Sequence, residues 1–287
     1  MSLERSPRLY LRAVALGLVP ILLALIGASD ARHYFDLIGL LLVLVPIAVI
    51  SGICWFRHQV SPSTLAYALG VPMGLVWVCF GLVSVFSGMS DLQALAPVTT
   101  ILLTTALYGG VVSGLGYLWD DSKGVETPAI STSSAIVCAI PLALTFVMGN
   151  IGSASNYGAL TEELALMIAL ITILSLTVSS DKPKPKAVAE VTIFSILILS
   201  LIGIMDLATI GSDTGFTDSQ AYMEGMSRVF FGMNIGLILY IFTIIWALHS
   251  GVFDSIDYGQ MNWHLVEAFS LLTLITIAPP SLYHFFE

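Results

Sequence analysis

Long apolar stretches separated by short polar connections fill almost all of this 287-residue chain. A membrane-spanning helix needs about 20 consecutive apolar residues. Stretches close to that length occur at 10–28, 37–56, 65–86, 97–119, 130–149, 160–179, 188–211 and 226–248. A ninth, weaker stretch at 265–283 ends in Pro279 and Pro280, so it is expected to be either a span or a re-entrant or interfacial helix. The pattern predicts an all-α polytopic membrane protein with about eight or nine transmembrane helices.

The amino-acid composition also indicates that the chain lies in a lipid bilayer. Charged residues make up 10% of the chain and hydrophobic residues 57%, whereas soluble domains carry about 25% charged residues. So few charges cannot cover a water-soluble surface, and the lipid bilayer is the expected surroundings. The net charge of −9, without a basic stripe, argues against nucleic-acid binding. Cys54, Cys79 and Cys138 lie inside apolar stretches and are expected to be small core residues rather than a disulfide framework or metal site.

The positive charges predict the orientation. With the N-terminus in the cytoplasm, eight of the ten Lys and Arg residues fall on the cytoplasmic side: Arg5, Arg8, Arg12, Arg57, Lys123, Lys182, Lys184 and Lys186. This bias follows the positive-inside rule and predicts a multi-pass protein with its N-terminus in the cytoplasm. The first apolar stretch resembles a signal peptide, but Pro20 and the helices that follow at once favour an uncleaved first helix.

An internal repeat is indicated by the order of features in residues 34–119 and 157–248. Each stretch has an acid at a helix start, a short basic loop, a glycine-containing helix, an acidic loop and a helix with a central glycine. Counting the preceding helix, each unit has four helices, so the copies run in the same direction. We expect a first four-helix repeat at 1–124, a diverged second repeat at 125–250 and a C-terminal hydrophobic helix at 251–287.

Residues 71–119 are the most specific segment, and they read as a helical hairpin. Its small and hydroxyl residues recur at helical spacing and are expected to serve helix packing; they are Gly74, Gly81, Gly109, Ser113 and Gly116. Thr100, Thr104 and Thr105 allow two interpretations. Their hydroxyls either bond across helices and to backbone carbonyls, or line a wet path for a cation or proton.

The same hairpin resembles a known family. Pro72-x-Gly74, Gly81-Leu-Val, Gly88-Met-Ser-Asp, Leu103-Thr-Thr and Leu107-Tyr-Gly look like the third and fourth transmembrane helices of the MotA/TolQ/ExbB family, closest to flagellar stator A subunits. The resemblance implies an inner-membrane ring around a single-span partner, whose carboxylate takes up an ion that passes between ring and partner. By position, Thr105 and Ala106 correspond to the polar site of the family's fourth helix, and Pro72 to the proline of its third.

Two features depart from that family. Trp77 and Val78 stand where the third helix usually has a threonine, which weakens a sodium-type site. The loop from Arg57 to Ser63 is too short for the large cytoplasmic domain of flagellar stators. We therefore expect a stator-like subunit of a proton-conducting complex, assembled with itself and with a single-span partner. Direct rotation of a flagellum is not expected.

Asp206 is the deepest acid of the predicted spans. An intramembrane carboxylate indicates function, and Asp206 is expected either to carry a proton or to bond to Arg228 at the interface. It also suggests an alternative function: a secondary transporter of a small solute or ion built from two parallel repeats, with its site near Asp206. A further alternative is a non-conducting membrane assembly subunit.

Evidence for an enzyme is missing from the sequence, because it has no phosphate loop, catalytic triad order or Cys-His site. His264 and Glu267 lie three residues apart and could bind a metal together with His249 and Asp254. Their spacing matches no known motif, so we expect no metal, no cofactor and no catalytic residues.

Overall fold

The computed structural model describes residues 36–88, 95–120, 126–152, 170–171, 173–174, 182–214 and 219–286. The helices within these ranges are α2 (Leu37–His58), α3 (Pro62–Gly88), α4 (Leu95–Trp119), α5 (Thr132–Gly152), α7 (Lys184–Thr214), α8 (Ser219–His249), the short 3₁₀ helix η4 (Phe253–Ser255) and α9 (Tyr258–Phe286). The predicted helix at 10–28 and most of that at 160–179 lie outside the described residues. The other predicted stretches all overlap described helices.

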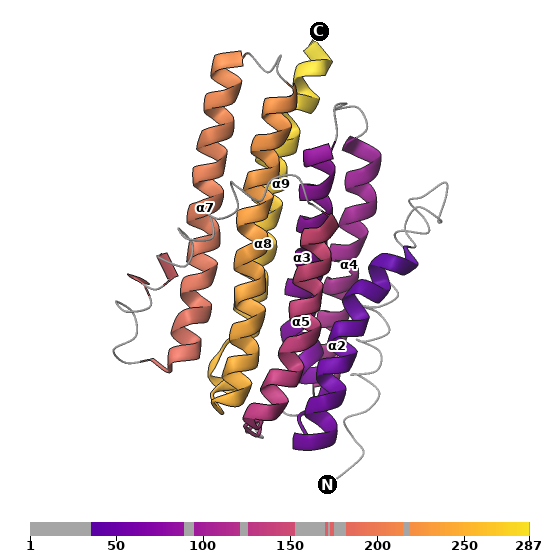
Figure 1. Ribbon diagram of the computed structural model, residues 1–287, viewed down its shortest axis with the longest axis vertical. Coiled ribbons are helices and arrows are strands. Elements are labelled where there is room, and N and C mark those ends of the chain that lie inside the picture. The colour runs from indigo at the N-terminus through magenta and orange to yellow at the C-terminus, as the bar shows by residue number, and fades with distance from the viewer. Residues whose placement is uncertain are drawn as a thin grey trace.

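The helices stand side by side along one long axis (Figure 1). Helices α3 and α8 form the centre, because 78% of the apolar window of each is buried, against 39% in α2 and 33% in α4. A helix that is apolar all round is suited to such a central place. Helices α2, α4 and α5 pack beside α3, and α7 packs beside α8.

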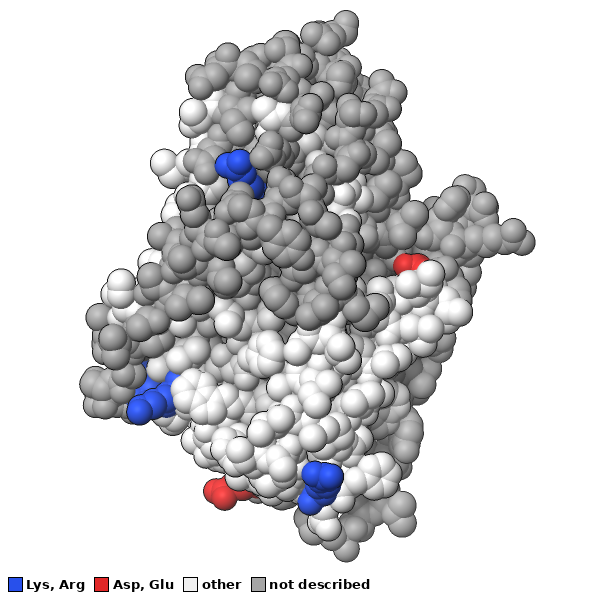
Figure 2. Space-filling model, viewed as in Figure 1, with Lys and Arg blue, Asp and Glu red and all other residues white. Residues whose placement is uncertain are grey.

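Five of the described helices are long and apolar enough to cross a bilayer: α2, α3, α4 from Leu102 onward, α7 and α8. Large apolar side chains also point outward, among them Ile38, Phe194 and Met205, which are 71%, 64% and 69% exposed. In Figure 2 the charged side chains of the described residues are a few separate spots among uncharged ones. A surface of this kind belongs in lipid, and the chain is a membrane protein.

One end of the bundle, at the bottom of Figure 1, gathers most of the described connections; we call it the base. Helices α2, α4 and α8 end there, and α3, α5, α7 and α9 begin there. The segment before α5 is tied to the one before α9, because the Thr127 hydroxyl donates to the Asp254 carboxylate at 2.6 Å and the Thr127 amide donates to it as well.

Helix α9 differs from the prediction. It begins at Tyr258 rather than 265, since the Asp257 carboxylate accepts a hydrogen bond from the Gln260 amide at 3.0 Å and caps the first turn. It also continues through Pro279 and Pro280 to Phe286. Proline has a φ angle that suits a helix and removes one hydrogen bond, a loss that membrane helices tolerate.

A proline inside α2 is compensated by a tryptophan of α3. Pro46 has no amide hydrogen, so the carbonyl of Leu42, four residues earlier, receives no helical hydrogen bond. The indole nitrogen of Trp77 donates to this carbonyl at 2.9 Å. Trp77, which stands where the stator family usually has a threonine, thus joins α3 to α2.

Candidate functional site

The small-residue face of α4 lies against α3 of the same chain. A Cβ added to Gly109 would lie 2.5 Å from the carbonyl oxygen of Gly70 and 2.8 Å from the Cα of Gly74. Ser113 donates from its hydroxyl to the Tyr67 carbonyl at 2.8 Å. Gly116 meets the backbone of α3 at Tyr67 in the same way. Small residues permit this close approach of two backbones.

The glycines of α3 complete this interface. Gly74 faces Gly109 and the carbonyl of Thr105, and Gly81 lies under the side chain of Leu102. The structure therefore brings all five residues expected to serve helix packing to the α3–α4 contact. It leaves no room along this contact for another helix.

Two of the three threonines expected to form an ion pathway have buried side chains in the structure. Thr105 is 4% exposed, and its hydroxyl lies beside Gly39 of α2, next to the Asp36 carboxylate. Thr104 is also 4% exposed. Thr100 belongs to α4, but its side chain lies outside the described residues. Within this chain α2 and α3 cover Thr105. A hydrated seam between α4 and another subunit stays a prediction.

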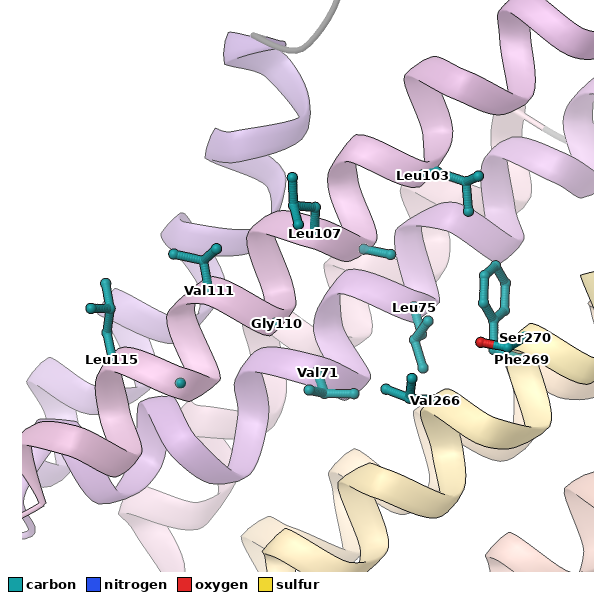
Figure 3. A pocket seen from close by; sticks show the side chains of 12 residues that line it. Val71, Leu75, Leu103, Leu107, Gly110, Val111, Leu115, Val266, Phe269 and Ser270 are labelled. Atoms are coloured by element: carbon teal, nitrogen blue, oxygen red, sulfur yellow. The ribbon is translucent and has the colours of Figure 1, made fainter. Parts of the chain in front are cut away.

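The opposite face of α4 is open and lines an apolar groove of about 440 Å³ between α3, α4 and α9 (Figure 3). The lining side chains come from all three helices: Val71, Leu75, Leu103, Ala106, Leu107, Gly110, Val111, Gly114, Leu115, Val266, Phe269 and Ser270. A Cβ added to Gly110 or Gly114 would meet nothing within 4 Å. Ala106, Gly110 and Gly114 follow one another every four residues, so they share this open face.

A second feature is a cluster of buried polar side chains near the base. Asn262 of α9 donates to the Tyr67 carbonyl at 3.0 Å and reaches the Ser113 hydroxyl at 3.5 Å. Tyr258 lies one turn earlier on α9, and Tyr240 of α8 is fully buried. The hydroxyls of Tyr240 and Tyr258 and the Asn262 carbonyl oxygen have no hydrogen-bond partner among the described residues. Most buried polar groups in proteins are paired, so this polar cluster stands out.

The chemistry of the polar cluster is that of neutral oxygen groups. Burial raises the pKa of Tyr258 well above its usual value, and the neighbouring Tyr240 and Asp254 act in the same direction. The phenol therefore keeps its proton and can donate as well as accept. Sequence reasoning missed this cluster, since Tyr67, Tyr240 and Asn262 are far apart in the chain and only the fold brings them together.

The charged residues singled out in the sequence do not converge on a metal site. His264 pairs with Glu267 at 3.2 Å, and His249 bonds to the Ile130 carbonyl at 3.0 Å. Asp254 is engaged by Thr127. Each of these side chains thus has a local partner, and the described residues hold no group of three or more His, Cys, Asp or Glu placed to bind a metal ion. Asp206 lies in α7, and its side chain is outside the described residues.

The fold and the groove define the class of the protein: an all-helical membrane protein whose helix α4 is packed on one side and open on the other. Comparison with protein families, with curated proteins and with solved structures yields no match for this chain.

Proposed function

We propose that this chain is a non-conducting assembly subunit of the membrane, which associates with a second copy of itself through the open face of α4. One observation carries the proposal: the hydroxyl-bearing face of α4 is buried against α2 and α3, whereas the face that lines the groove presents Ala106, Gly110 and Gly114. In lipid, helices associate through close packing of small residues. An open row of glycines on α4 favours a partner helix, because the backbone of that helix can come close to the backbone of α4.

The groove suits a helix better than an ion. Among its twelve lining residues only Ser270 has a hydroxyl, and none is charged. The α4 part of the groove runs from Leu103 to Leu115, which is roughly 18 Å of helix. A second copy is the simplest occupant, since a two-fold axis would bring the same glycines of both chains together.

Cysteine cross-linking in membranes tests the proposal. In a background with the three native cysteines replaced by alanine, Gly110→Cys is expected to give a covalent dimer on oxidation. Val137→Cys is the matched control, because Val137 is exposed on α5, away from α4, and it should stay monomeric. Monomers from both variants, or a lipid retained in the groove with no dimer in native mass spectrometry, would refute the proposal.

The orientation forms part of the same proposal. Arg57 and Lys184 lie at the base, and Lys182 forms an ion pair with Glu190 there at 2.6 Å. The positive-inside rule then directs the base to the cytoplasm of a bacterial cell. With the segments 10–28 and 160–179 counted as helices, the chain has eight or nine spans in two parallel repeats. Reporter fusions after residues 60 and 216 would give cytoplasmic and external signals, respectively.

A second candidate function is transport of a small solute or ion, and the polar cluster favours it. Three unpartnered oxygen groups on α8 and α9 could bind a small polar molecule or a weakly hydrated cation. This candidate predicts uptake in liposomes that Tyr240→Phe abolishes and Tyr222→Phe leaves intact. The absence of any uptake across a panel of small solutes and monovalent cations would leave the assembly function alone.

A further inference from the structure

Helices α2 and α5 pack antiparallel with a register that can be read from two contacts. His58 Nε2 and Ser134 Oγ share a hydrogen bond at 2.9 Å. One turn further from the base, the sulfur atoms of Cys54 and Cys138 are 3.7 Å apart. Each helix advances by four residues between the two contacts, as two antiparallel helices must. The next pair in this register, Ile50 and Leu142, is also buried.

This register makes the approach of the two sulfurs a property of the helix pair. The hydrogen bond below and the apolar pair above hold the backbones on both sides of the cysteines. A disulfide has a sulfur–sulfur distance of about 2.05 Å, so the two atoms need to move closer by less than 2 Å. Rotation of two unbranched cysteine side chains provides a displacement of this size.

The third cysteine provides a contrast. Cys79 is equally buried, but it lies in the upper half of α3. It is 17 residues beyond Pro62 at the base, whereas Cys54 is four residues from His58. At a rise of 1.5 Å per residue, Cys79 lies roughly 20 Å further from the base than Cys54. It therefore cannot reach the pair.

From this geometry we propose that Cys54 and Cys138 are an oxidative modification site, which hydrogen peroxide, a small and membrane-permeant oxidant, converts into a disulfide between α2 and α5. One thiol sulfur attacks the peroxide; the O–O bond breaks, a sulfenic acid forms and water leaves. The second thiol then attacks the sulfenic sulfur; the S–S bond forms, the S–O bond breaks, and the thiol proton leaves with the hydroxyl as a second water. Two thiols are oxidised by two electrons, and one hydrogen peroxide is reduced to two waters.

The position of the pair explains why the reaction stops at the disulfide. Both sulfurs are fully buried, so only a small uncharged oxidant can reach them. Once a sulfenic acid has formed, the partner thiol is already in contact. The condensation therefore precedes further oxidation to the sulfinic acid.

Peptide mapping of the full chain in liposomes tests the proposal with hydrogen peroxide as the probe. We expect the intact mass to fall by roughly 2 Da, the mass of two hydrogens, and a peptide containing Cys54 to be linked to one containing Cys138. Dithiothreitol should reverse both changes. Cross-linking should raise the midpoint of thermal unfolding, because it restricts the unfolded chain.

Single substitutions serve as controls. Cys79→Ala is expected to leave the cross-link unchanged, whereas Cys54→Ala and Cys138→Ala each abolish it and let the remaining thiol of the pair form a dimedone-reactive sulfenic acid. A folded protein that takes up peroxide oxygen at Cys79 as fast as at the pair, or forms no Cys54–Cys138 link while a detergent-unfolded sample does, overturns the proposal. The test is independent of whether α4 mediates dimerisation.

Discussion

Gly74 of α3 and Gly109 of α4 lie so close that neither could carry a side chain without displacing the other: a Cβ on Gly74 would be 2.9 Å from the Gly109 Cα, and one on Gly109 would be 2.8 Å from the Gly74 Cα. The contact holds the α3–α4 hairpin together from within. These two glycines of the 71–119 hairpin, the most specific segment of the sequence, therefore serve packing within one chain.

A pair of alanine substitutions should separate the two faces of α4. Gly109→Ala is expected to lower the free energy of unfolding by about 1–3 kcal/mol, since the added methyl overpacks the contact. Gly110→Ala gains the same helix propensity but enters open space within the single chain, so it should not destabilise the monomer. Thermal unfolding in detergent measures both, and equal stability of the two variants would contradict the assigned packing.

The tryptophan bridge to α2 predicts an interaction energy that can be measured. Trp77→Phe should cost about 1–3 kcal/mol of stability, because it leaves the part-buried Leu42 carbonyl without a donor. In a Pro46→Ala background the restored amide hydrogen can donate to that carbonyl, so the same substitution should cost less. A double-mutant cycle on chemical denaturation gives the coupling.

Exposed tryptophans provide the control for this cycle. Trp263 is 62% exposed on α9, and Trp263→Phe should have an effect of less than about 0.5 kcal/mol in either background. A coupling of zero between Trp77 and Pro46 would mean that the indole does not replace the missing helical hydrogen bond.

Ion conduction along α4 is expected to be absent. Purified protein in liposomes should show no proton or sodium flux above that of empty vesicles, and Thr105→Val should change nothing, because the Thr105 hydroxyl is covered by α2 and α3. Dye-based pH and sodium assays check this. A flux in the native protein that Thr105→Val abolishes would restore the stator-like interpretation.

The link between Thr127 and Asp254 should control the motion of the connection before α5. Asp254→Asn weakens the hydrogen bonds to the Thr127 amide and hydroxyl. We expect faster amide hydrogen exchange at residues 126–131, with unchanged exchange in α8. Asp36→Asn, at the opposite end of α2, is the control and should leave exchange at 126–131 as it was.

Much of the fold follows from the sequence, for a simple reason. In lipid a backbone must satisfy its own hydrogen bonds, so each apolar stretch forms a helix, and α2, α3 and α4 lie where hydropathy places them. The boundaries of α9 were harder to predict: the apolar stretch starts at 265, but the capping carboxylate of Asp257 adds polar turns before it.

The site was less predictable, because spacing along one helix does not say which neighbour a face meets. Thr105, Gly109 and Ser113 share a face in any α-helix, and the sequence could not decide between a wet seam and the backbone of α3. Gly110 and Gly114 have the same spacing, yet they face open space instead of the backbone of α3. The polar cluster depends on contacts across nearly 200 residues, such as that between Tyr67 and Asn262.

The replacement of a helical hydrogen bond in α2 by the Trp77 indole has a consequence for biosynthesis. The α2 segment is made before α3, so after it enters the bilayer the Leu42 carbonyl has no donor until the next segment follows. An unsatisfied carbonyl in hydrocarbon costs several kcal/mol. Insertion of α2 and α3 as a joined pair avoids this cost, and the short connection between His58 and Pro62 keeps the donor within reach.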